Sequence, residues 1–278
     1  MSETLGEGVI LAGRYSIDSL FTIGDFSVLY LAHDLRFADP SKLVILKQRI
    51  ITSSDITMHE LIVRNFEREA DLLATLSHPA IPEIYDYFRE ESRSYIVMEF
   101  IEGKNLRMTL DGTQGFLAEE HITSWAILVC EVLQYLHSHR PQSIIHRDVK
   151  PQHLVLDPAD AIHIVGFGIA RVYLPGQKAS LLGTSAYAAP EQYRGDATPR
   201  SDIYALGATL YHLLTRKVPP PEYLPAYSEH HAAELNPGVS MSMESILRKA
   251  MDPNPDGRFE TANEMKRALI GIAANESE

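Results

Sequence analysis

The stretch IHRDVKPQH occupies residues 145–153 of this 278-residue chain. It is followed by VGFG at 165–168 and by APE at 189–191. A His-Arg-Asp triplet on its own carries little information, because three residues recur by chance. Its combination with the adjoining Lys-Pro and with the two later motifs makes coincidence implausible. The three motifs therefore belong together and are interpreted as parts of one functional region of the chain.

The motifs resemble those of the eukaryotic-like Ser/Thr protein kinases found in bacteria, and the resemblance extends over nearly the whole chain. It implies an α+β fold of two lobes, with a β-rich N-lobe that carries one main helix and a mainly helical C-lobe. We expect a protein kinase-like domain at 12–272, divided into an N-lobe at about 12–102 and a C-lobe at about 103–272. The ends, 1–11 and 273–278, are expected to be flexible.

The hydrophobic pattern agrees with this division. The first hundred residues read mainly as strands, apart from a helical stretch that should end before His78-Pro79, because the residue before a proline avoids helical conformation. From Glu119 onward the period is mainly helical. The expected strands are 14–21, 26–33, 43–49, 84–88 and 94–100, the expected helices are 66–76, 122–137 and 203–214, and a short hairpin is expected at 154–156 and 161–165.

Composition restricts the class of protein. Hydrophobic residues make up 45% of the chain, enough for a sizeable core, and the formal net charge of −12 argues against nucleic acid or an anionic membrane as the main partner. The single cysteine, Cys130, lies in an apolar helical run and is expected to be an inert core thiol. The first residues lack the pattern of a signal peptide, and no apolar run is long enough to span a bilayer. We expect a cytoplasmic protein.

The resemblance assigns roles to charged residues of the loop. It implies that Asp148 accepts the proton of a substrate hydroxyl, that Lys150 steadies the transferred phosphate, and that Arg147 pairs with a phosphorylated activation segment. Thr184, in the substrate-docking stretch 183–191, matches the hydroxyl that bonds the catalytic Asp and Lys. The alternative is that these residues only maintain the fold of the loop.

Both positions that hold magnesium in the family are changed here. His153 stands where the family has Asn, and Gly166 stands where it has the Asp of Asp-Phe-Gly. Magnesium favours hard oxygen ligands in near-octahedral geometry, so imidazole is a poor substitute and glycine offers no ligand. No cluster of Cys or His supports zinc in this loop. We expect His153 to have a hydrogen-bonding structural role.

The phosphate-covering loop is also altered. The family's glycine-rich pattern aligns with residues 22–29, TIGDFSVL, and only Gly24 is retained. Such loops work because backbone N–H groups approach the phosphates closely, which Cβ atoms obstruct. Asp25 adds a negative charge where phosphates would lie. By resemblance Lys47 is the phosphate-binding lysine and Glu69 its helical partner, although this pair also docks the helix on the sheet.

The adenine pocket is the remaining part of the nucleotide site. Ile45 stands where the family has Ala. The larger side chain adds three heavy atoms to the pocket, and overpacking of a tight site costs roughly 1–3 kcal/mol. We expect Ile45 to fill part of the adenine slot. By resemblance the other nucleotide-binding positions are Leu29 above the base, Val155 below it, Met98 at the back, and the neighbouring Glu99 and Ile101.

Packing positions of the family are retained. Leu73, His146 and Phe167 match the residues that join the lobes, and Asp202 and Gly207 match the signature of a buried helix. Glu191 and Arg258 are expected to form a buried ion pair.

These observations favour a pseudokinase that acts as a scaffold or allosteric partner, with an active kinase or another signalling protein as its partner. No cofactor is expected: binding of ATP stays open, and binding of Mg²⁺ conflicts with both altered positions. Two alternatives remain: an active or weakly active Ser/Thr kinase, and a metal-independent nucleotide-sensing module. Ser180 is the one obvious phosphoacceptor retained, and the sequence does not decide whether Ser180 or Thr184 is phosphorylated.

Overall fold

The computed structural model of the chain describes residues 4–24, 27–37, 42–50, 56–90, 93–174, 186–218 and 231–275. The chain divides into two compact units, Met1–Glu102 and Gly103–Glu278. These are the N-terminal unit and the C-terminal unit, respectively.

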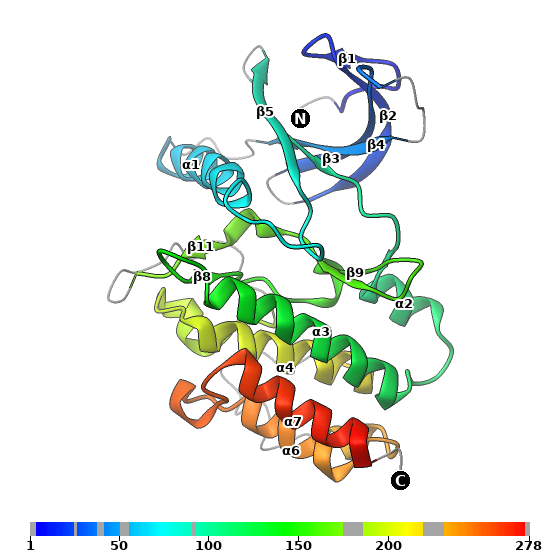
Figure 1. Cartoon of the computed structure of the whole chain (residues 1–278), viewed down its shortest axis with the longest axis vertical. Helices are drawn as coiled ribbons and strands as arrows, with labels where there is room; N and C mark the ends of the chain where they lie inside the picture. Colours follow the sequence, from blue (N-terminus) through cyan, green and yellow to red (C-terminus); the bar gives the residue numbers. More distant parts are fainter. Residues whose placement is uncertain are drawn as a thin grey trace. The chain divides into compact units, whose positions relative to one another are not determined.

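The N-terminal unit is built on an antiparallel sheet. In the residues that the structure describes, six strands lie in the order β1-β2-β3-β4-β6-β5. Figure 1 labels five of them, β1 to β5. One helix, α1, follows β4 in the chain. The elements are β1 (Ile10–Leu11), β2 (Tyr15–Ile23), β3 (Ser27–Asp34), β4 (Leu43–Arg49), α1 (Ile56–Leu73), β5 (Ile84–Glu90) and β6 (Arg93–Glu99).

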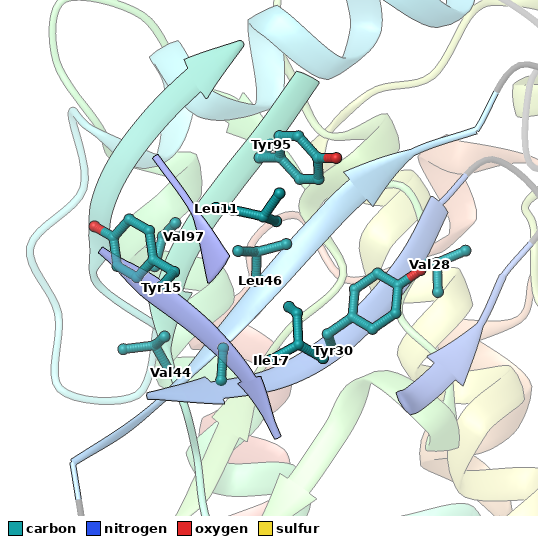
Figure 2. Packing of buried hydrophobic residues seen from close by; sticks show 10 residues of the cluster. Leu11, Tyr15, Ile17, Val28, Tyr30, Val44, Leu46, Tyr95 and Val97 are labelled. Carbon is teal, nitrogen blue, oxygen red and sulfur yellow. The ribbon is translucent and has the colours of Figure 1, made fainter. Parts of the chain in front are cut away.

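The two faces of this sheet carry separate core clusters, because successive side chains of a strand point to opposite faces. Val44 and Leu46 of β4 join Tyr95 and Val97 of β6 on one face, where Figure 2 shows them packed with residues of β1, β2 and β3. On the other face, Ile96 packs against Phe66 and Ala70 of α1. Helix α1 therefore covers the face to which Ile45 and Lys47 of β4 also point.

The C-terminal unit is mainly helical. Figure 1 shows α3, α4, α6 and α7 lying side by side, and α3 packs against both α4 and α7. Helix α4 is buried along nearly its whole length. The helices are α2 (Leu106–Gly112), α3 (Glu119–His137), α4 (Pro199–Thr215), α5 (Ala232–Leu235), α6 (Met241–Ala250) and α7 (Ala262–Asn275), with 3-10 turns η1 (Pro151–His153), η2 (Phe167–Ile169), η3 (Pro190–Arg194) and η4 (Pro255–Gly257).

Short strands of the C-terminal unit position the loop residues. Strands β9 (Leu154–Leu156) and β10 (Ile162–Ile164) form the predicted hairpin, and β9 also pairs with β7 (Lys104–Asn105). Strand β8 (Ile144–Ile145), whose second residue is the first residue of the IHRD motif, pairs with β11 (Arg171–Val172). The loop residues are therefore held at both ends by regular backbone pairing.

The expected α+β class, with a β-rich part followed by a helical part, is confirmed. All three predicted helices begin earlier than expected; α3 begins at Glu119 and not at residue 122. Helix α1 begins at Ile56 and not at residue 66, because Ile62, itself buried, extends the apolar face of Phe66 and Ala70 toward the N-terminus. Helix α4 begins at Pro199 and not at residue 203. Proline is favoured at the first helical position, and the backbone N–H of Thr198 donates to the Ser201 hydroxyl oxygen at 2.9 Å.

The core position predicted for Cys130 is confirmed. Cys130 is fully buried in α3, and burial raises the pKa of its thiol far above the ordinary value. Within the described segments, no helix is both long and apolar enough to cross a membrane.

The buried ion pair between Glu191 and Arg258 is also confirmed. Two guanidinium nitrogens of Arg258 donate to the two carboxylate oxygens of Glu191 at 2.7 and 2.9 Å, and Ser201 donates to the same carboxylate at 2.6 Å. Burial by itself would raise the pKa of Glu191, but these hydrogen bonds outweigh it and the net shift is downward. The pair joins the η3 turn to the segment before α7.

We predict that Arg258→Ala lowers the free energy of unfolding by about 3–5 kcal/mol, because it leaves the Glu191 carboxylate buried without its partner. Urea unfolding followed by circular dichroism measures the change. The matched control is Asp256→Ala, which breaks the pair with Arg200; Asp256 is 87% exposed, so the control should change little. Equal effects of the two variants would contradict the structural role of the buried pair.

Candidate functional site

The IHRD loop is held by one buried carboxylate. Asp202 of α4 accepts the backbone N–H groups of His146 at 2.9 Å and Arg147 at 2.7 Å, and the ring of His137 lies 2.9 Å from the same carboxylate. Arg147 has a φ of 69°, a left-handed conformation that is unfavourable for a non-glycine residue. The Asp202 contacts offset that strain, so α4 fixes the backbone of the loop.

His146 links the loop to the 165–168 segment. Its Nε2–H donates to the carbonyl of Val165 at 3.1 Å, and its Nδ1 accepts the N–H of Asp148 at 3.3 Å. The ring meets the ring of Phe167 edge-on, with centroids 4.8 Å apart. Burial lowers the pKa of His146 to about 4, so the ring is neutral at physiological pH and has the tautomer that these contacts require.

Arg147 is the second buried residue of the triplet. It donates to the carbonyl of Ile169 at 3.2 Å, and its own carbonyl accepts the Gln192 side chain at 2.8 Å. Burial, with the charge of the neighbouring Arg171 as a second cause, lowers the pKa of its guanidinium to about 10. Arg147 thus places a desolvated positive charge beside a second arginine.

Asp148 and Lys150, the predicted catalytic residues, are brought together. Lys150 Nζ lies 2.8 Å from Asp148 Oδ2. The other carboxylate oxygen, Oδ1, is buried and has no hydrogen-bond partner in the part of the chain that the structure describes. A carboxylate with one oxygen neutralised and one able to accept a proton donor can orient a hydroxyl group.

His153 and Gly166 lie against each other. The Nδ1–H of His153 donates to the carbonyl of Asp148 at 2.9 Å, and the same nitrogen is 3.4 Å from Asp148 Oδ2. Gly166 directly precedes η2 and has φ 82° and ψ 45°, a left-handed conformation. The expected hydrogen-bonding role of His153 is confirmed by its contact with the Asp148 carbonyl.

The residues at these two positions do not fit the magnesium ion that the family resemblance implies. Gly166 has no ligand atom, and the Nδ1 of His153 uses its proton toward Asp148. In the described segments, no group of three or more His, Cys, Asp or Glu residues could hold a metal ion. Magnesium needs several oxygen ligands in near-octahedral geometry, which these side chains do not supply.

The N-terminal unit carries most of the predicted nucleotide-binding positions. Lys47 Nζ lies 2.7 and 2.6 Å from the two carboxylate oxygens of Glu69, so the predicted pairing is confirmed. Ile45, on the same face of β4, is only 6% exposed. The remaining positions are Gly24 between β2 and β3, Leu29 on β3, Met98 and Glu99 on β6, and Ile101 just after β6; Val155 lies on β9 of the C-terminal unit.

The retained glycine of the β2–β3 turn is not required by its own conformation. Gly24 has no positive φ, and a Cβ there would make an ordinary 3.5 Å contact with the carbonyl oxygen of Ser27. Its N–H donates to that oxygen at 2.8 Å, which closes the turn. At the described position 24, therefore, neither the backbone conformation nor the available space requires a glycine.

Three residues discussed from the sequence, Asp25, Ser180 and Thr184, lie outside the described residues. Sequence reasoning missed the contacts of Asp202 with the loop backbone and of Gln192 with Arg147. A signal for Asp202 was present, because a carboxylate at the start of an apolar, buried helix needs internal donors.

Comparison with known proteins identifies the family. The model of the protein kinase domain matches residues 15–269. Serine/threonine-protein kinase PknB of Mycobacterium tuberculosis is 32% identical over 280 residues, which are 94% of this chain and 43% of PknB. Serine/threonine-protein kinase PrkC of Bacillus subtilis is 34% identical over 271 residues, 93% of this chain and 40% of PrkC. The chain thus spans about two fifths of the length of these relatives.

Solved structures agree. The crystal structure of the PknI kinase domain of Mycobacterium tuberculosis has a TM-score of 0.74 at 25% identity, and the match covers 96% of this chain and 99% of that one. The structure titled PpkA-294 apo form has a TM-score of 0.81 at 21% identity, with 96% and 100% covered, and supports the fold alone. With its motifs, its two units and these matches, the chain belongs to the protein kinase family and is a relative of the bacterial eukaryotic-like Ser/Thr kinases.

Proposed function

We propose that this chain is a pseudokinase: a kinase-fold protein that binds and regulates other proteins and does not transfer phosphate from magnesium-bound ATP. The observation that carries the proposal is the contact between His153 and Gly166. A glycine and an imidazole already engaged with Asp148 occupy the two positions where the family holds magnesium. Metal ions neutralise the charge that develops on the transferred phosphate, so their loss removes a main catalytic term.

The N-terminal unit supports the same conclusion. Ile45 is buried on the face of β4 that carries Lys47, where the family has the much smaller Ala. A larger side chain there reduces the room for a flat base. The β2–β3 turn retains Gly24 alone, and that glycine has an ordinary backbone conformation.

A binding role also accounts for what has been kept. Asp202 still holds the loop backbone, Glu191 still pairs with Arg258, and Lys47 still pairs with Glu69. These contacts maintain the shape of each unit whether or not phosphate is transferred. A protein kept for its surface needs them as much as an enzyme does. The partner we propose is another protein, either an active kinase or a further component of signalling.

A second candidate is a weakly active Ser/Thr kinase, and one observation favours it. Asp148 has a buried oxygen without a partner among the described residues, and Lys150 lies against its other oxygen. This arrangement still suits a general base beside a phosphate-binding lysine. A third candidate, a nucleotide sensor that works without metal, rests on the retained lysines alone.

The proposal predicts no phosphate transfer above background. Purified protein incubated with radiolabelled ATP, Mg²⁺ and a generic protein substrate should label neither itself nor the substrate more than its Asp148→Asn variant does. Repeating the assay with Mn²⁺ tests a relaxed metal requirement. Labelling that depends on Asp148 would contradict the pseudokinase and establish the weak enzyme.

A restoration series tests the nucleotide pocket separately. We predict that Gly166→Asp with His153→Asn does not restore magnesium-dependent ATP binding, and that adding Ile45→Ala does, because both the metal site and the room for the base are then present. Binding is measured by isothermal titration, with Ile45→Ala alone as the control. Full recovery without the Ile45 substitution would show that the base pocket had been open throughout.

A further inference from the structure

The space beside Gly166 is occupied by His153. An ideal Cβ built on Gly166 would lie 2.5 Å from His153 Nδ1 and 2.6 Å from both Cε1 and Cγ of the same ring. Carbon atoms of real side chains essentially never approach other atoms so closely, because the repulsion rises steeply below van der Waals contact. The His153 ring therefore lies where any side chain at position 166 would begin.

The ring is fixed from several directions. Its Nδ1–H donates to the Asp148 carbonyl at 2.9 Å, and it makes an edge-type contact with the ring of His146, with centroids 6.3 Å apart. The backbone of His153 is bonded on both sides: its N–H donates to Lys150 O, and its carbonyl accepts the N–H of Val165, each at 2.9 Å. The ring is only 22% exposed. Moving it aside would break the contact with Asp148.

We infer that His153 and Gly166 form a mutually dependent pair. The His153 ring connects the catalytic loop to the 165–168 segment, the connection that a metal ion would otherwise make. The inference rests on the proposed function and extends it. The site is then closed to divalent cations in two ways, by the missing carboxylate and by the ring that occupies its place. An acidic side chain at position 166 would meet the His153 ring, so it cannot take up the metal-binding position while that ring stays in place.

The left-handed backbone of Gly166 contributes separately to the loss of stability that a substitution there would cause. This contribution must be subtracted to isolate the effect of the clash with His153. Its φ of 82° is unfavourable for any residue with a Cβ. Gly115 provides a matched control, because it lies in the same unit with φ 78° and a Cβ there would meet nothing within 4 Å. Gly115→Ala therefore reports the backbone cost alone, and Gly166→Ala reports the backbone cost together with the clash.

A double-mutant cycle in EDTA, without nucleotide, tests the pairing. We expect Gly115→Ala to lower the midpoint of thermal unfolding by about 2–4 °C and Gly166→Ala to lower it by about 5–10 °C. In a His153→Ala background, the loss caused by Gly166→Ala should fall to that of Gly115→Ala. In a His163→Ala background it should stay unchanged, because His163, 13% exposed, lies on β10 and contacts Asp157.

Two results would overturn the inference from this cycle. One is an equal loss from Gly166→Ala with and without His153. The other concerns the case in which Gly166→Ala alone fails to fold, and the yield of soluble protein is then measured in place of the midpoint. In that case an insoluble Gly166→Ala/His153→Ala double variant contradicts the pairing, and a soluble one supports it.

Magnesium alone provides the second arm. We compare the midpoint of thermal unfolding in MgCl₂ with that in NaCl at equal ionic strength. For the double variant Gly166→Asp/His153→Asn, MgCl₂ should raise the midpoint by about 2 °C or more. For the single variant Gly166→Asp, the midpoint should not change. A rise in the single variant, or none in the double, contradicts the inference. Because no nucleotide is present, neither result depends on whether the natural chain transfers phosphate, which the labelling assay decides separately.

Discussion

The buried carboxylate of Asp202 fixes the geometry on which the C-terminal unit's candidate site depends. Its two oxygens accept the N–H groups of His146 and Arg147, the latter in a left-handed conformation that needs such support. Because α4 is buried along nearly its whole length, this carboxylate cannot move without disturbing the core. The position of Asp148, and through it of Lys150 and His153, follows from that constraint.

This firmly held loop carries His153, which with Gly166 does not fit a magnesium ion. The family resemblance implies that a magnesium ion would be held by one residue of the catalytic loop and one of the segment after it. Here a hydrogen bond from His153 to the Asp148 carbonyl and close packing on Gly166 join the two segments. Such a link needs no bound ion, so the site can stay ordered without nucleotide. That property suits a protein whose shape is recognised by a partner.

Much of this could be predicted from the sequence, because short motifs specify chemistry and hydrophobic period specifies elements. The β-rich and helical halves, the β9–β10 hairpin, the Lys47–Glu69 pair and the Glu191–Arg258 pair were all predictable in this way. The fit of His153 over Gly166 was not, since it depends on a left-handed backbone and on a ring orientation that no local pattern specifies. The role of Asp202 toward the loop required the fold as well, because the residues concerned are far apart in the chain.

The central claim is that this kinase fold no longer uses magnesium to bind nucleotide. Isothermal titration of the natural chain with ATP, in MgCl₂ and in EDTA, tests it most directly. The account predicts the same result in both buffers, with either no measurable heat or an affinity that magnesium does not change. A markedly tighter binding of ATP in magnesium would contradict it, because the chain would then hold the metal despite Gly166 and His153.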